Sequence, residues 1–500
     1  MPSLGVGRVT SVLAGCMAVS LVAFSVSSCS TAPSRPAAAH EAPTVKSFAP
    51  SYAGTPKLAP PDLTDDGPGS LVSVTQIKSG AEMLDQDEAA YMRVVYRSTS
   101  GIDGSPTQVS AAIAVPAGTP PKGGWPVIGF GQGTKGVLYK CAASLYPMLP
   151  LQAWTMDVFI KNGYAVVASD FQGSGVKGFA HPFLDSKTYG YNVIDSVKAL
   201  RRVGADISDR WLAYGHSAGG LAVWSATEWA AEYGKGLNLL GTIAMAPAAD
   251  MSGLAEAAWN ETLTPEQRIT MVWALQSLKW FHPEMNLDDF RSGATAANWD
   301  ELLDCLPPNF DDIARVRSLM TNADLKPKTY QDAVWLREQL EARAVPSARR
   351  IDTPLVVAYG TQDGLVQQAW FEKALARACA AGSNLEIRKG PGKGHADLDF
   401  GFVLGWLNAP CAWLMGVPWN ECGQVGALLG ERVVLNEFLA YLHLSQQGGT
   451  LSPRSVEITT YALCGFANFG SVAIQIGGIG ALVPHRRAEL AQLGLKSMLG

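Results

Sequence analysis

Residues 211–220 read WLAYGHSAGG, and this stretch decides the fold. It joins a short apolar run to a helical pattern rich in small residues, through a Gly-x-Ser-x-Gly turn centred on Ser217. A serine at such a strand-to-helix turn is held in a strained conformation that exposes its hydroxyl, and glycines beside it relieve clashes with the flanking strand and helix. The alternative is a tight turn with an incidental serine. The setting of the pentapeptide favours a nucleophile.

Short apolar runs alternate with helical patterns on both sides of this turn. Alternating apolar residues predict two early strands, at 91–96 and 109–115. Residues 192–203 and 220–233 have helical spacing. Fully apolar runs lie at 125–130, 164–169, 211–214, 240–246 and 355–359. Continuous apolar strands that alternate with helices predict an α/β fold with a parallel sheet covered on both faces.

Between about residues 250 and 350 the strand signals disappear and the pattern becomes helical. An insertion of this length between two strands predicts a helical cap over the strand ends. The cap's tryptophans either form its own core, which we favour, or line a pocket for an acyl chain. They are Trp259, Trp273, Trp280, Trp299 and Trp335.

A serine hydroxyl becomes a nucleophile when a base takes its proton and an acid orients that base. In folds with this turn, the acid and then the histidine follow the serine in the chain. His395 lies in a glycine-rich loop after an apparent strand and is the expected base, the alternative being a solvated loop histidine. Asp363 follows the carboxyl end of a buried strand, the edge where ligands gather in α/β sheets, and is the expected acid.

Rival residues are excluded by their positions. Asp352 precedes the strand, and Asp397 follows the histidine too closely to reach around its ring. His216 is directly beside the serine but is expected to point elsewhere.

The negative charge that develops on an attacked carbonyl oxygen needs two fixed N–H donors. One is expected at the backbone of Ala218, directly after the nucleophile. The other is expected from the glycine-rich loop 129–136, and we assign it to Thr134. The spacing of these glycines is not that of a phosphate-binding loop. No metal or organic cofactor is expected.

Composition limits the partners. The 500 residues are too many for one ordinary core, and 47% of them are hydrophobic. A net charge of −5 without a basic tract argues against nucleic acid and favours a small neutral or apolar substrate.

The N-terminus has the form of an export signal. Arg8 is the only charged residue among the first thirty, and an apolar stretch follows it. We expect residues 1–29 to be a lipoprotein-type signal with Cys29 as the lipidated residue. The residues before Cys16 also resemble a lipoprotein cleavage motif, but cleavage there would leave too short an apolar region for a signal. The alternative is a signal that is cleaved without lipidation, followed by free secretion. Residues 30–70, rich in Pro, Ala, Ser and Thr, predict a disordered tether. The chain is therefore expected outside the cytoplasm, at the cell envelope or beyond, where disulfides form.

From about residue 71 to residue 395 the chain resembles the secretory lipase family of α/β-hydrolases, which includes fungal A-type lipases and actinobacterial relatives. The resemblance rests on residues 131–136 (GQGTKG) with Cys141, 163–173 (GYAVVASDFQG), 181–184 (HPFL), 215–220 (GHSAGG), 360–363 (GTQD) and 394–395 (GH). It implies an α/β-hydrolase domain over residues 71–400, and a lipase or carboxylesterase activity. The chain departs from bacterial relatives at Gln132, where they usually have His, and at Ala218, where they usually have Gln. Both departures keep the backbone donors but put the substrate preference in doubt.

The same resemblance implies two disulfides. One would join Cys141, in the loop after the expected oxyanion strand, to Cys305 in the cap. The other would join Cys379 to a cysteine after the histidine, for which Cys411 is the nearest candidate.

The sequence changes character at about residue 404. Residues 458–484 contain no charged side chain. An uncharged stretch of this length can span a bilayer, so it predicts a hydrophobic helical membrane-type segment. Residues 404–500 resemble the C-terminal region of concentrative nucleoside transporters through 430–441 (GERVVLNEFLAY), 451–455 (LSPRS) and 461–471 (YALCGFANFGS). That resemblance implies nucleoside-binding positions at Glu437, Phe466, Asn468 and Ser471.

The transporter-like segment lacks the earlier helices of that family, so we do not expect it to transport by itself. A genuine gene fusion and an artefact of recombination, frameshift or assembly both remain open. The leading hypothesis is an exported serine esterase or lipase that cleaves lipid or other carboxylic esters, with membrane contact through the lipid anchor and the apolar tail. The alternatives are a nucleoside-transport membrane protein with an exported hydrolase-like domain, and a non-catalytic hydrolase-like binding module.

Overall fold

The computed structural model describes residues 27–28, 58–77, 89–146, 153–305, 310–398, 400–434, 437–447 and 449–464. The chain divides into two compact units at the boundary between Leu398 and Asp399. Each unit is described by itself. Cys29, Phe466, Asn468 and Ser471 lie outside the described residues.

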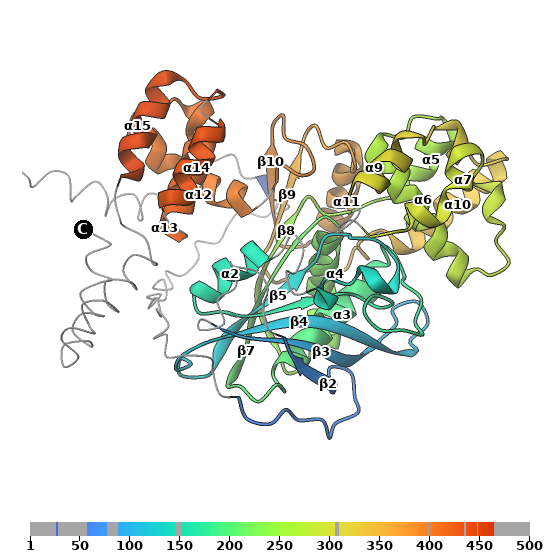
Figure 1. The fold of residues 1–500 in the computed structure, drawn as a ribbon, viewed down its shortest axis with the longest axis horizontal. Helices are drawn as coiled ribbons and strands as arrows, with labels where there is room; N and C mark the ends of the chain where they lie inside the picture. Colours follow the sequence, from blue (N-terminus) through green and yellow to red (C-terminus); the bar gives the residue numbers. More distant parts are fainter. Residues whose placement is uncertain are drawn as a thin grey trace, which may run out of the picture. The chain divides into compact units, whose positions relative to one another are not determined.

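The first unit is built on one mixed sheet of ten strands (Figure 1). Their order across the sheet is β1-β10-β9-β8-β7-β5-β6-β4-β3-β2. The strands from β10 to β6 in this order are parallel to one another, and β4, β3 and β2 continue the sheet antiparallel. The strands are β1 Ser27–Ser28, β2 Leu71–Gln76, β3 Ala89–Thr99, β4 Pro106–Pro116, β5 Trp125–Gly131, β6 Ala165–Ser169, β7 Ile207–His216, β8 Asn238–Met245, β9 Leu355–Gly360 and β10 Leu385–Gly390.

The central strands are buried because helices connect them and cover the sheet. All five residues of β6 are buried, as the uninterrupted apolar run predicted. The connecting helices are α2 Ala153–Lys161, α3 Ser186–Leu200, α4 Ala218–Tyr233 and α11 Gln368–Ala380. Helix α3 begins where the Asp185 side chain accepts the N–H of Thr188 at 2.8 Å. Trp211 in β7 and Trp224 in α4 are almost completely buried. The α/β expectation is confirmed.

The cap between β8 and β9 is helical, and Figure 1 shows its helices gathered in one group. They are α5 Gly253–Trp259, α6 Pro265–Phe281, α7 Gly293–Ala297, α8 Trp299–Leu302, α9 Phe310–Ser318 and α10 Tyr330–Arg343. Capping boxes at Thr264 and Thr329 start α6 and α10. Trp273 and Trp299 lie in the hydrophobic core of the unit, and Trp280 and Trp335 pack partly buried against it, so these four tryptophans serve packing.

The hydrolase unit begins before residue 71, which corrects the expected end of the tether. Backbone N–H groups of Ala59 and Asp62 donate to the carbonyls of Gly204 and Arg202 at 2.9 and 3.0 Å. The Arg202 guanidinium also pairs with Asp65 at 2.6 Å. Residues 58–70 therefore lie along the domain, held by backbone and ionic contacts that their Pro-rich and polar composition does not reveal.

The second unit is a group of short helices, α12 Phe400–Leu414, α13 Cys422–Val434, α14 Glu437–Gln447 and α15 Pro453–Leu463. Helices α12 and α13 approach so closely that a Cβ on Gly426 would lie 2.4 Å from the carbonyl oxygen of Gly405. Within the described ranges, no helix has both the length and the apolar character needed to cross a membrane. Most of the uncharged stretch 458–484 lies outside those ranges.

Glu228 of α4 makes the stability of the first unit depend on pH. Burial raises the pKa of this carboxyl to about 7, although the backbone and hydroxyl of Ser347 both donate to it at 2.9 Å. The folded state therefore keeps the proton on Glu228 at pH values where the unfolded chain has released it, since the ordinary pKa of this carboxyl is 4.5. The free energy of unfolding accordingly falls as the pH rises from about 4.5 to about 7.

Glu228→Gln keeps an acceptor for Ser347 but removes the charge. We expect it to raise the free energy of unfolding by about 3–4 kcal/mol at pH 8, at ~1.4 kcal/mol per pKa unit, and by much less at pH 5. Urea unfolding at both pH values measures this. The exposed Glu232 on the same helix provides the matched control, Glu232→Gln. An equal gain at both pH values would contradict the assignment.

Candidate active site

The turn between β7 and α4 holds Ser217 in a strained conformation. Its φ is +60° and its ψ is −124°, in the region that residues with a side chain rarely adopt. Its backbone N–H donates to the Met245 carbonyl at 2.9 Å, so the neighbouring strand β8 fixes the turn. A Cβ on Gly219 would lie 1.9 Å from the carbonyl oxygen of Gly131, which explains why glycine follows the turn. The hydroxyl is thus presented at the carboxyl edge of the sheet.

The structure brings the three sequence-predicted residues into one hydrogen-bonded chain. His395 Nδ1 lies 2.7 Å from Asp363 Oδ2, and His395 Nε2 lies 2.9 Å from Ser217 Oγ. Nδ1–H donates to the carboxylate, which leaves Nε2 as the acceptor for the serine hydroxyl. This arrangement matches a nucleophile, a base and an orienting acid.

Asp363 is itself held rigidly after β9. Its side chain is fully buried, and Oδ1 accepts the backbone N–H groups of Leu365 and Val366, each at 2.8 Å. These donors leave Oδ2 for the imidazole. The carboxylate is therefore fixed by its own loop before the histidine arrives.

His216 takes a position that the sequence did not predict. Its Nε2 lies 3.0 Å from the backbone carbonyl oxygen of His395, and the two rings lie 5.2 Å apart. Burial, followed by the neighbouring charge of His395, lowers the pKa of His216 to about 4, so a neutral ring donates this bond. His216 supports the loop of His395, together with Asp397, which accepts the N–H of Gly394 at 2.7 Å. No sequence signal links positions separated by 179 residues.

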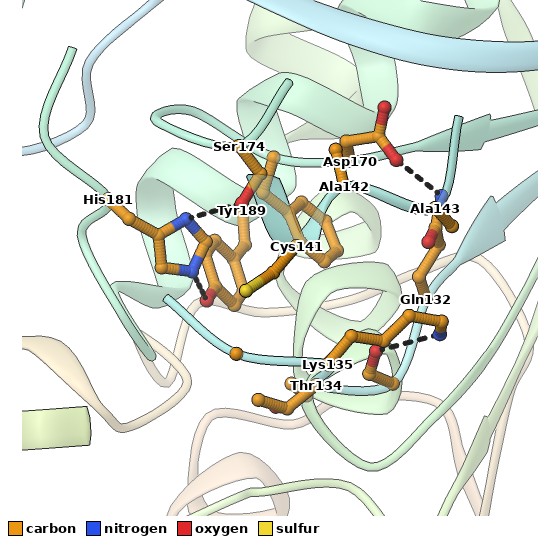
Figure 2. A pocket seen from close by; sticks show the side chains of 14 residues that line it. Gln132, Thr134, Lys135, Cys141, Ala142, Ala143, Asp170, Ser174, His181 and Tyr189 are labelled. Atoms are coloured by element: carbon orange, nitrogen blue, oxygen red, sulfur yellow. Dashed lines mark hydrogen bonds between the residues drawn. The ribbon is translucent and has the colours of Figure 1, made fainter. Parts of the chain in front are cut away.

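The loop after β5 lies beside Ser217. A Cβ built on Gly133 would lie 3.9 Å from Ser217 Cβ. Thr134 and Ala218 line one pocket, shown in Figure 2. Gln132 anchors the loop, because its amide donates to the Ala168 carbonyl at 3.1 Å and to a carboxylate oxygen of Asp170 at 3.3 Å. Gln132 therefore has a structural role here.

The far wall of this pocket is polar. His181 Nδ1 lies 2.6 Å from the Gln172 carbonyl oxygen. Figure 2 shows its two other bonds, from Nδ1 to Ser174 Oγ at 3.3 Å and from Nε2 to the Tyr189 hydroxyl at 3.0 Å. Burial lowers the pKa of His181 to about 4. The side chain of Lys135 also lines the pocket and is 8% exposed. The sequence placed His181 and Lys135 within family motifs, 181–184 and 131–136, but gave neither residue a role, because a single polar residue in a loop has no distinguishing pattern.

The cysteines follow the expected pairing in one case only. Cys141 and Cys305 form a disulfide with their Cα atoms 5.1 Å apart, which joins the pocket wall to the cap. Cys379 is also in a disulfide, but Cys411 keeps a thiol. The suggested Cys379–Cys411 bridge is therefore wrong.

The remaining candidate positions form no site among the described residues. Glu437 is the first residue of α14. Within the ranges that the structure describes, no group of three His, Cys, Asp or Glu side chains is placed to hold a metal ion.

Comparison with known families agrees with this geometry. Residues 151–412, just over half of the chain, match the model of the family described as secretory lipase. The chain belongs to the secretory lipase family. Membership identifies it as an exported carboxylic ester hydrolase.

Solved structures show that this secretory lipase has the α/β-hydrolase fold. A mutant of the cell-wall-degrading esterase LipA from Xanthomonas oryzae superposes with a TM-score of 0.54 at 18% identity, covering 67% of this chain and 94% of that one. A putative hydrolase from Legionella pneumophila gives 0.55 at 16% identity, with 72% and 98% covered. Candida antarctica lipase A gives 0.53 at 17%, with 72% and 83% covered.

The C-terminal part matches a different family. Residues 374–500 match the model described as Na+ dependent nucleoside transporter C-terminus, which overlaps the lipase match. The putative nucleoside permease NupX of Escherichia coli is 48% identical over 107 residues, which cover 21% of this chain and 25% of NupX. Mouse sodium/nucleoside cotransporter 1 is 39% identical over 117 residues, with 20% and 18% covered. The lipase thus spans a quarter or less of these relatives.

Proposed function

We propose that this secretory lipase cleaves carboxylic esters through Ser217, His395 and Asp363. The observation that carries the proposal is the continuous chain of hydrogen bonds, 2.9 Å from serine to imidazole and 2.7 Å from imidazole to carboxylate. Ser217 Oγ attacks the ester carbonyl while His395 Nε2 takes its proton, and Asp363 stabilises the imidazolium. The imidazolium then gives the proton to the departing alcohol. Water hydrolyses the acyl-enzyme by the same relay.

The oxyanion donors are the backbone N–H groups of Ala218 and Thr134. Ala218 is the first residue of α4, where helix N–H groups have no acceptor within the helix and the dipole favours negative charge. Thr134 directly follows Gly133, on which a Cβ would lie 3.9 Å from Ser217 Cβ. Two such donors stabilise the tetrahedral intermediate by a few kcal/mol each.

Covalent labelling tests this mechanism directly. The full-length protein is treated with a fluorophosphonate and digested, and the modified peptide is identified by mass spectrometry. We expect one adduct at Ser217, formed at the same rate as ester hydrolysis is lost. An active esterase that is not modified at Ser217 would refute the mechanism, and a protein with neither activity would favour the binding-module alternative.

The enzyme is further proposed to be attached to the outer face of the cytoplasmic membrane. The export of the family and the sequence around Cys29 support this location, and the apolar C-terminal segment adds membrane contact. Cleavage before Cys29 would remove β1 and leave β10 as that edge of the sheet. We expect Cys29→Ser to shift esterase activity from the membrane fraction to the soluble extracellular fraction, because one acyl anchor is lost. Cys16→Ser is the matched control. Activity that stays in the membrane fraction in both variants would assign attachment to the tail.

A further inference from the structure

The loop that carries Thr134 also holds an ammonium group with few partners. Lys135 is 8% exposed, and among the residues that the structure describes its Nζ donates only to the Gly133 carbonyl, at a long 3.4 Å. An ammonium has three N–H donors, and burying such a charge without partners is costly. The site is therefore built with unused hydrogen-bonding capacity on a positive charge.

The nearby carboxylate does not neutralise Lys135. Asp170 attracts it through space, but Oδ1 of Asp170 accepts from the Ser144 backbone at 3.1 Å and from Gln132, and Oδ2 accepts from Ser110 at 2.7 Å. Among the described residues, Lys135 forms no ion pair with a carboxylate. Burial lowers the pKa of Lys135 to about 8, so the group is still charged at neutral pH.

Asp170 also lines this pocket, with its two carboxylate oxygens accepting from Ser110, Ser144 and Gln132. The other polar groups of the lining are neutral. His181 is uncharged, and its two ring nitrogens are occupied by Gln172 and Tyr189. The pocket also includes Thr134 and Ala218, the residues proposed to bind the carbonyl oxygen of the ester (Figure 2). A substrate group in this pocket therefore meets a positive charge close to the scissile bond.

We propose that this pocket is an anion subsite, in which Lys135 binds a carboxylate of the ester substrate. The natural substrate class would then be an acidic ester rather than a neutral triacylglycerol. The inference rests on the proposed function, because it assumes that the ester carbonyl lies at Thr134 and Ala218. The carboxylate satisfies the free N–H donors of Lys135, which repays the cost of keeping that ammonium buried.

The test compares esters that differ only in charge. Full-length enzyme hydrolyses 4-nitrophenyl hydrogen adipate, with the anion in the acyl part, and neutral 4-nitrophenyl hexanoate. A second pair, 4-butyryloxybenzoate and phenyl butyrate, places the anion in the leaving group instead. For each pair, the measured quantity is the kcat/KM of the anionic ester divided by that of the neutral ester. We expect this ratio to be at least about tenfold lower in Lys135→Met than in wild type for one of the two pairs. The pair that responds shows whether the pocket holds the acyl part or the leaving group. The exposed Lys122 supplies the control, Lys122→Met.

Two results would overturn the proposal. One is a charge preference that is the same in Lys135→Met and wild type for both pairs. The other is equal inhibition of wild-type hexanoate hydrolysis by monomethyl adipate and dimethyl adipate, a measurement that needs no folded variant. Hydrolysis of neutral esters with labelling at Ser217 but without any charge preference would refute the subsite alone. A protein that neither hydrolyses neutral esters nor is labelled at Ser217 would refute the proposed function.

Discussion

Ser217→Ala is expected to lower kcat for ester hydrolysis by at least about 10⁴-fold, with KM changed little. The substitution removes the nucleophile, and removal of this residue in serine hydrolases costs orders of magnitude in kcat because the triad acts as a unit. Binding and the oxyanion donors remain, so weak catalysis over water persists. Initial rates with 4-nitrophenyl hexanoate measure the effect.

The fold is expected to tolerate this change. The hydroxyl of Ser217 contacts His395 Nε2, while the turn itself is fixed by backbone bonds to Met245 and by the close approach of Gly219 to β5. Ser225→Ala in the same helix is the matched control, since the Ser225 hydroxyl has no hydrogen-bond partner among the described residues. More than about 1% of wild-type kcat in Ser217→Ala, with a native melting curve, would require a different nucleophile.

Asp363→Asn is expected to lower kcat by about 10³- to 10⁴-fold while the domain remains folded. The asparagine oxygen still accepts the N–H groups of Leu365 and Val366, so the loop keeps its shape. The amide nitrogen then faces His395 Nδ1 and stabilises the tautomer with its proton on Nε2. That tautomer cannot accept the proton of Ser217.

The two rival carboxylates provide the comparison for this variant. Asp352 is exposed and bonded to Arg350, and Asp352→Asn should keep wild-type kcat. Asp397 acts on the histidine loop through Gly394, so Asp397→Asn is expected to have an intermediate effect. A larger loss in either rival than in Asp363→Asn would reassign the acid.

Much of the fold was predictable because it depends on local patterns. Apolar runs such as 164–169 recur as strands, here β6, since a parallel strand covered on both faces has no polar position. The turn at Ser217 was recognisable because small residues are required where β7, α4 and β5 approach within van der Waals contact. Composition was a weaker guide, and it assigned residues 58–70 to a tether although they bond to the loop after α3.

The sequence by itself determined the fold class and predicted Ser217 as the nucleophile, because both depend on residues within about ten positions of one another. Only the tertiary structure decided how His216 supports the loop of His395, where Lys135 lies relative to Asp170, and that Cys411 does not join Cys379. Each of these depends on the distance between segments that are remote in the chain. Packing sets such distances, and packing leaves no periodic trace in the sequence.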